Sequence, residues 1–154
     1  MSDTGMPYGA PDDAELEVLQ SDAEMAAMFI AEALDHLGTI EALVLQLEAT
    51  PDDVGLLNDI FRPFHTVKGN AGALGIVSIQ ELAHKTENLL MLARSGQLSV
   101  GPEEADAILQ SVDILTTMIT DLNLRLSGQT PRDVARARAE LMLALDALVA
   151  TPRA

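Results

Sequence analysis

Cysteine and tryptophan are absent from this chain of 154 residues, and it has only three phenylalanines and one tyrosine. Without cysteine, disulfide scaffolds, thiol nucleophiles, iron–sulfur clusters and cysteine-ligated zinc sites are excluded. Long apolar runs are missing too, since none approaches the roughly 20 residues of a membrane-spanning helix. The first residues also lack the basic and then apolar order of a signal peptide. We therefore expect a cytoplasmic protein without membrane insertion.

Basic side chains are scarce: the sequence has nine lysines and arginines but 24 aspartates and glutamates, which gives a formal net charge of −15. Such an acidic excess disfavours attraction to nucleic acids and to anionic lipid. We therefore expect no nucleic-acid partner. The apolar fraction of 48% is still enough to bury a core, and the length suits one domain.

The alternation of β-branched and polar residues that marks strands is also lacking, whereas apolar residues recur at helical spacing almost throughout. The fold class is therefore predicted to be all-α. Long amphipathic helices with short links favour an antiparallel four-helix bundle with an additional C-terminal fifth helix. We expect a flexible leader over residues 1–19, the bundle over 20–128 and the accessory helix, docked on the bundle, over 129–154.

Capping and breaking signals predict where each helix begins and ends. The first helix contains the apolar residues Met25, Phe29, Leu37, Ile40, Val44 and Leu47 on one side. Capping boxes at Ser21 with Glu24 and at Ser78 with Glu81 mark the starts of the first and third helices. The first four helices are predicted to run from Ser21 to about Ala49, from Thr50–Pro51 to near Gly75, from Ser78 to Gly96 and from Gly101–Pro102 to Gly128. The fifth is predicted to begin at Thr130–Pro131.

One segment, FRPFHTVKGNAGALG, departs from this uniform pattern. The apolar residues of this segment lie on one side of a helix, which we expect to face the core. His65, Lys68, Gly69 and Gly72 lie on a separate strip beside them, so His65 is expected to face outward. A glycine inside a helix costs about 1 kcal/mol relative to alanine, so two on one strip indicate that something approaches the backbone there. Pro63 is expected to kink the helix and tilt the turn that presents His65.

These residue types suit phosphoryl transfer. An imidazole has an ordinary pKa of about 6.5, so near neutral pH much of it carries a free nitrogen lone pair. Lys68, one turn further on, is a point charge suited to phosphoryl oxygens. If the flank of the third helix that carries His84 and Glu87 meets the second helix, Glu87 can accept a hydrogen bond from one nitrogen of His65 and so fix the tautomer that attacks.

At these residues the sequence resembles the histidine-containing phosphotransfer (HPt) domain, and within it the N-terminal domain of CheA-type chemotaxis kinases. The matching strings are IFRPFHTVKGNAGALG and IQELAHKTENLLMLARSGQL, which cover Ile60 to Leu98. The resemblance implies that His65 is phosphorylated on Nε2, that Lys68 assists the transfer, and that His84 and Glu87 complete the hydrogen-bonded surroundings of His65.

We also assign partner docking to Phe61, Arg62, Gly69 and Gly72, with close helix–helix packing as the alternative for the two glycines, and we assign no metal ligand. Asn70 and Pro63 depart from the residues usual in the family.

The sequence contains no glycine-rich nucleotide loop and no length for an ATP-binding domain. We therefore expect a relay that binds no cofactor itself, while its partner domains use ATP and Mg²⁺. The expected partners are the catalytic domain of a histidine kinase and CheY-like response-regulator receiver domains. The kinase domain would act in trans or belong to a larger parent protein.

Two other classes of function remain open. One is a non-catalytic acidic module that docks a partner helix. The other is a metal-binding bundle in which His65, His84 and Glu87 converge. Di-iron bundles, however, use glutamates on two helices and Glu-x-x-His motifs on two others, and this sequence has only the reversed order, once.

Overall fold

The computed structural model describes residues 23–130 and 132–153. This part of the chain is helical, without a strand, which confirms the all-α class. Its helices are α2 (Ala23–Gly38), α3 (Ile40–Ala49), α4 (Val54–Ala73), α5 (Val77–Arg94), α6 (Pro102–Leu126) and α7 (Ala135–Ala150). None of these helices is long and apolar enough to cross a bilayer. The predicted leader over residues 1–19 lies outside the described residues.

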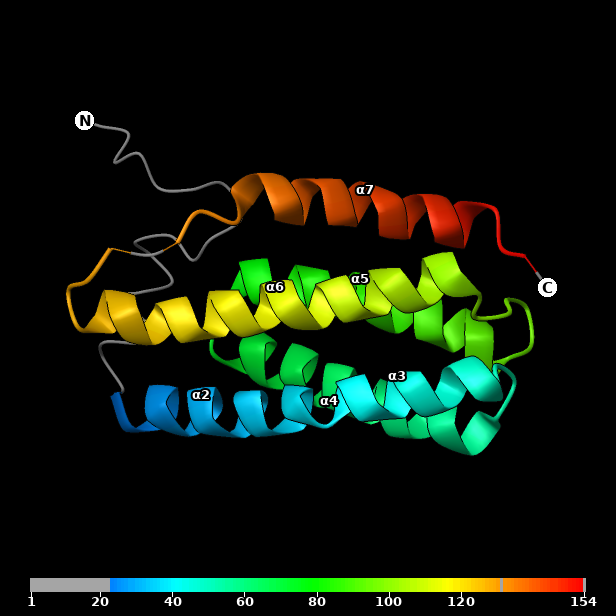
Figure 1. Ribbon diagram of the computed structural model, residues 1–154. Coiled ribbons are helices and arrows are strands. Elements are labelled where there is room, and N and C mark those ends of the chain that lie inside the picture. The colour runs from blue at the N-terminus through cyan, green and yellow to red at the C-terminus, as the bar shows by residue number, and fades with distance from the viewer. Residues whose placement is uncertain (1–22, 131, 154) are drawn as a thin grey trace.

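Figure 1 shows α2 and α3 end to end along one edge of the molecule, with α7 along the opposite edge. The α2–α3 rod packs against both α4 and α6, and α5 packs against α4 and α6 to close the bundle. Helix α7 lies outside this bundle, on α5 and α6. The arrangement is the predicted four-helix bundle with a fifth helix at its side.

The predicted first helix is divided in two, which corrects its expected run to Ala49. Helix α2 ends at Gly38, and the Thr39 hydroxyl donates a hydrogen bond of 2.8 Å to the His36 carbonyl oxygen. Met25 was expected in the core, but it is 50% exposed and Ala26 is buried instead. The predicted cap at Ser21 lies outside the described residues.

Three helix starts also differ from their predictions. The carboxylate of Asp53 accepts a hydrogen bond of 3.1 Å from the Leu56 amide, so α4 begins at Val54 rather than at Thr50. Helix α5 begins at Val77, and Ser78 lies buried in its first turn rather than capping it.

Helix α7 begins at Ala135 and not at the predicted Thr130, with the Asp133 carboxylate accepting a hydrogen bond of 3.0 Å from the Ala135 amide. Pro131, the other half of that predicted opening, lies outside the described residues.

The predicted glycine stops are confirmed, because Gly75, Gly96 and Gly128 have φ angles of 75°, 79° and 78°. At the end of α4 the Ile76 amide donates to the Ala71 carbonyl at 2.8 Å. This is the hydrogen bond across five residues that is typical of a Schellman cap. This tight reversal lets α5 run back along α4. The two helices then bury their apolar sides against each other and present their adjoining polar strips together.

Pro63 does not end α4, which continues from Val54 to Ala73 with the proline ring buried. Proline has no N–H to donate to the carbonyl of Asp59, so the helix lacks one backbone hydrogen bond here but does not break. On the same helix Phe64 and Val67 are buried in the core. His65, between them in sequence, is exposed on the outer side of the helix, as predicted.

Ion pairs fasten α7 and its flanking segments to the bundle. Lys85 on α5 pairs with Asp146 at 2.6 Å, and Arg138 pairs with Glu81 at 3.3 Å. The remaining pairs are Arg132 with Asp121 at 3.1 Å, and Arg153 with Glu103 at 2.9 Å and Glu104 at 3.3 Å. Polar contacts therefore add to the burial of Leu141 and Leu145 in holding this helix.

Candidate functional site

His65 stands on the outer face of α4 with its side chain 60% exposed. Its Nδ1 atom is hydrogen-bonded to Oε2 of Glu87 on the neighbouring helix α5. The other ring nitrogen, Nε2, has no hydrogen-bond partner among the described residues. The predicted contact between His65 and Glu87 is thus present, with one nitrogen held by the protein and the other open to solvent.

Glu87 is the buried centre of the site, with only 4% of its side chain exposed. Burial by itself raises the pKa of this carboxyl group, but hydrogen bonds from Lys68 and His65, together with their charges, outweigh that effect and hold the pKa below its ordinary value of 4.5. Glu87 is therefore ionised at neutral pH and accepts hydrogen bonds only. In a neutral His65 the proton consequently lies on Nδ1, and the lone pair lies on the exposed Nε2.

Lys68 lies one turn along α4 from His65 and shares the same carboxylate. Its Nζ atom donates to Oε1 of Glu87 at 2.6 Å, and 24% of its side chain is exposed. An ammonium has three donors, so this contact leaves further N–H groups for another acceptor. Sequence reasoning placed Lys68 beside His65 but did not anticipate that one carboxylate would hold both side chains.

His84 is not part of this hydrogen-bonded group. Its side chain is exposed on α5 and forms no hydrogen bond or ion pair with any described residue. The expectation that it completes the hydrogen-bonded surroundings of His65 is therefore not met in this structure. A role for His84 during transfer stays a prediction.

The two glycines of the strip have different surroundings. A Cβ atom added at Gly69 would meet nothing within 4 Å, so this position is open on the surface. A Cβ atom added at Gly72 would come within 2.6 Å of Nε2 of Gln80, so Gly72 leaves room for the end of this side chain from α5. Of the predicted docking residues, Gly69 and the exposed Arg62 remain accessible. Gly72 faces the Gln80 side chain.

Two further residues surround the imidazole. The ring of Phe61 is stacked on that of His65, with centroids 5.6 Å apart and an interplanar angle of 15°. The guanidinium carbon of Arg94, at the end of α5, lies 4.0 Å from the centroid of Phe61. From the sequence, Phe61 is assigned to partner docking and Arg94 is given no role. The one signal in the sequence was its place in the matched ARSGQL string, which gives no contact between helices.

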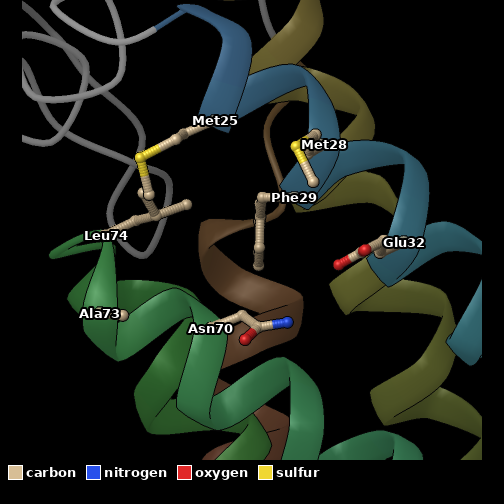
Figure 2. Close-up of a pocket in the computed structure, with 7 residues that line it drawn as sticks. All are labelled: Met25, Met28, Phe29, Glu32, Asn70, Ala73 and Leu74. Carbon is tan, nitrogen blue, oxygen red and sulfur yellow. The ribbon is translucent and has the colours of Figure 1, made fainter.

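A shallow apolar hollow of about 160 Å³ lies further along α4, between this helix and α2. Figure 2 shows Met25, Met28 and Phe29 on the α2 side and Asn70, Ala73 and Leu74 on the α4 side. The Asn70 amide, one of the departures from the family pattern, extends toward α2 in this view. This residue therefore borders the hollow rather than the hydrogen bonds of His65.

The geometry does not favour the metal-binding alternative. Among the described residues no group of three histidine, aspartate or glutamate side chains is placed to hold one ion. The oxygen of Glu87 that does not bind His65 binds the ammonium of Lys68. What the site does combine is an exposed ring nitrogen, a buried carboxylate that orients it and an adjacent cation, an arrangement suited to a phosphoryl acceptor.

Comparison with known families agrees with this description. A family profile for the Hpt domain matches residues 24–125, which include α3 to α5 and nearly all of α2 and α6. The chain therefore belongs to the Hpt domain family.

Relatives within that family include CheA proteins. The chain is 34% identical over 114 residues to the chemotaxis protein CheA of Bacillus subtilis, an alignment that covers 74% of this chain and 17% of that protein. It is 31% identical over 118 residues to CheA of Halobacterium salinarum, covering 77% and 17%. The chain thus spans less than a fifth of the length of these curated relatives.

Solved structures show the same similarity. The CheA phosphotransferase domain from Thermotoga maritima is 33% identical with a TM-score of 0.64, covering 66% of this chain and 97% of that one. The phosphorylated P1 domain of CheA3 from R. sphaeroides, solved in complex with CheY6, is 27% identical with a TM-score of 0.68, covering 82% and 96%. The arrangement of helices found here is therefore that of CheA phosphotransfer domains.

Proposed function

We propose that His65 accepts a phosphoryl group through Nε2 from the ATP-binding domain of a CheA-type histidine kinase and passes it to an aspartate of a response-regulator receiver domain. The observation that carries this proposal is the hydrogen bond between Nδ1 of His65 and Glu87, which leaves Nε2 exposed. The proton held on Nδ1 makes Nε2 the nucleophile, and its exposure lets two different partners reach it in turn.

In the first step the Nε2 lone pair attacks the γ-phosphorus of ATP. A nitrogen–phosphorus bond forms, the bond from that phosphorus to the β,γ-bridging oxygen breaks, and ADP leaves with that electron pair. The imidazole ring, still protonated on Nδ1, gains positive charge, which the Glu87 carboxylate stabilises. In the second step a receiver carboxylate attacks the phosphorus, and Nε2 recovers its lone pair as the nitrogen–phosphorus bond breaks.

Lys68 serves the same transfer. Its ammonium lies beside the imidazole and has N–H donors beyond the one given to Glu87, so it is placed to bind an oxygen of the incoming phosphoryl group. The exposed Gly69 on the same strip leaves room for the surface of a partner. His84, Phe61 and Arg62 remain further candidates for contact with partner domains.

The similar proteins support these partners. The structure from R. sphaeroides pairs a phosphorylated P1 domain with CheY6, and we extend that pairing to this chain and a CheY-like receiver. ATP and Mg²⁺ would belong to the partner domains, and we place the reaction in the cytoplasm, where ATP is available. If the chain is a segment of a larger CheA-type protein, that parent would be the histidine kinase.

The test is to incubate the purified protein with a CheA-type kinase domain and labelled ATP, comparing the wild type with His65→Gln. We expect acid-labile, base-stable label in the wild type and none in the variant. His36→Gln removes a partly buried histidine of α2, outside the site, and should be labelled like the wild type. A His65→Gln variant that still takes up label would contradict the proposal, because another residue would then be the acceptor. A variant that keeps full signalling activity in cells would favour a docking module.

A further inference from the structure

We infer that Arg94 is a positioning residue for the His65 nucleophile and acts through the ring of Phe61. This inference rests on the proposed function, because it concerns the same ring nitrogen. It gives Phe61 a role inside the domain, in addition to any contact with a partner.

A single hydrogen bond does not fix the plane of an imidazole ring. The imidazole turns about its Cα–Cβ and Cβ–Cγ bonds, and the hydrogen bond from Nδ1 to Glu87 restrains only one atom of the ring, so its plane keeps some freedom. The nearly parallel ring of Phe61, at 15° to the imidazole, restricts this freedom. Phe61 and His65 are four residues apart and so lie on the same side of α4. The hydrogen bond and the stacked ring together determine where the Nε2 lone pair points.

Phe61 needs its own restraint, because it is only partly buried. The guanidinium of Arg94 supplies that restraint from α5, with its carbon 4.0 Å from the ring centroid, as in a cation–π contact. Glu87 and Arg94 are seven residues apart, about two helical turns, and therefore project from the same side of α5. One helix thus holds the imidazole twice, directly through Glu87 and indirectly through Arg94.

The charge pattern around Arg94 supports the same conclusion. The sequence has 24 acidic residues against nine basic ones, so an exposed arginine has many possible ion-pair partners. Arg94 nevertheless forms no ion pair with any acid in the described part of the chain, and its recorded contact is with Phe61. The planar guanidinium suits a ring face better than a lysine ammonium would.

The kinetic test uses two phosphoryl donors. Phosphoramidate is a small donor without a docking surface and reports the intrinsic reactivity of Nε2, whereas a CheA-type kinase domain with ATP also reports docking. We expect Arg94→Ala to slow labelling of His65 by phosphoramidate about 3- to 10-fold. With the kinase we expect it to lower kcat by a similar factor while KM for this protein is unchanged. Arg94→Lys should recover part of the loss. Arg136→Ala, which removes a fully exposed arginine of α7, is the control for loss of one positive charge.

A double-mutant cycle tests whether Arg94 acts through Phe61. In a Phe61→Leu background, Arg94→Ala should have little further effect on the phosphoramidate rate. Additive effects, or a change in KM alone, would overturn the inference and make Arg94 a docking residue.

Nuclear magnetic resonance of the unphosphorylated protein gives a readout that needs no donor. The stacked Phe61 ring shifts the Hδ2 and Hε1 resonances of His65, and Arg94→Ala should move them toward their positions in Phe61→Leu. Unchanged resonances would contradict the inference. If neither donor labels the wild type at His65, the proposed function fails, and the resonance shifts still decide whether Arg94 orients the ring.

Discussion

Glu87 is the residue on which the site depends most, because each of its oxygens holds a different functional side chain. A carboxylate can only accept hydrogen bonds, so it selects the Nδ1–H form of His65. A glutamine at this position has one accepting oxygen and one donating NH₂ group. It therefore cannot satisfy both neighbours in the same way, and it permits the tautomer that carries its proton on Nε2.

We predict that Glu87→Gln lowers the rate of His65 phosphorylation by about 10- to 100-fold, the range typical when a residue that orients a functional histidine is lost. Single-turnover labelling with a kinase domain measures this rate. Glu48→Gln, at an exposed position of α3, is the matched control and should be labelled at the wild-type rate. Equal rates for Glu87→Gln and Glu48→Gln would show that the tautomer is fixed by something else.

The lowered pKa of Glu87 also predicts a pH dependence of stability. A carboxyl group whose pKa is lower in the folded state stabilises the fold above its ordinary value of 4.5, and this contribution is lost as the pH falls through the lower, folded value. The difference in free energy of unfolding between the wild type and Glu87→Gln should therefore shrink as the pH falls below 4.5. Urea denaturation followed by circular dichroism at several pH values measures it. A difference that grows toward acid pH would be inconsistent with the lowered pKa.

Residue identity allowed His65 and Glu87 to be paired from the sequence, because their types and helical spacing limit the possible geometries. The contact of Arg94 with Phe61 could not be predicted in that way. It depends on how far one helix is shifted along its neighbour, which the spacing within each helix does not determine. Gly72 illustrates the same limit, since its neighbour Gln80 comes from across the turn between α4 and α5.

Among the helices, α4 carries a residue that lowers its stability, Gly69, on the same strip as His65. Gly69 lies on an open surface in the middle of this helix, where alanine is favoured over glycine by about 1 kcal/mol. The glycine therefore lowers the stability of the helix at a position where no described side chain needs the space.

We predict that Gly69→Ala raises the free energy of unfolding by about 1 kcal/mol, and that Gly72→Ala raises it less because Gln80 must move. Urea denaturation measures both. Labelling of Gly69→Ala by phosphoramidate should match the wild type, whereas labelling by the kinase domain should be slower if a partner approaches this strip. Equal labelling by the kinase would count against a docking role for Gly69.

Helix ends were predicted better than helix beginnings. A glycine stop depends on one residue that tolerates a positive φ, as Gly75 does. A start depends on which of several polar residues turns its side chain back to the helix, and Asp53 did so although Thr50 precedes the proline. The break at Thr39 was not visible because Leu37, Ile40 and Val44 keep helical spacing across it.

In the molecule as a whole, α7 is attached by polar contacts that the apolar pattern could not indicate. The clearest is Arg138, which is buried and donates to the Ser78 carbonyl at 2.9 Å and to Glu81. Its Nε atom has no hydrogen-bond partner in the part of the chain that the structure describes. Periodicity predicted a helix beyond the four of the bundle, whereas the way in which this helix is held required the three-dimensional contacts.

We predict that Arg138→Ala lowers the free energy of unfolding by about 2–3 kcal/mol, because it removes charge-assisted hydrogen bonds and leaves a cavity. Arg138→Met should lose less, since it keeps most of the apolar volume and eliminates the buried unpaired Nε. Urea denaturation measures both variants, with Arg136→Ala as the control. If the alanine and methionine variants are equally unstable, the volume of the side chain has no importance at this position.

If His65 carries a phosphoryl group as proposed, its exposure would also affect how long that group lasts. A phosphoryl group on Nε2 would be accessible to water, because 60% of the His65 side chain is exposed. Spontaneous hydrolysis then competes with every encounter between the phosphorylated domain and a receiver. Local receiver concentration would therefore set the fraction of phosphoryl groups delivered before water removes them. The message would persist only as long as loading by the kinase continues.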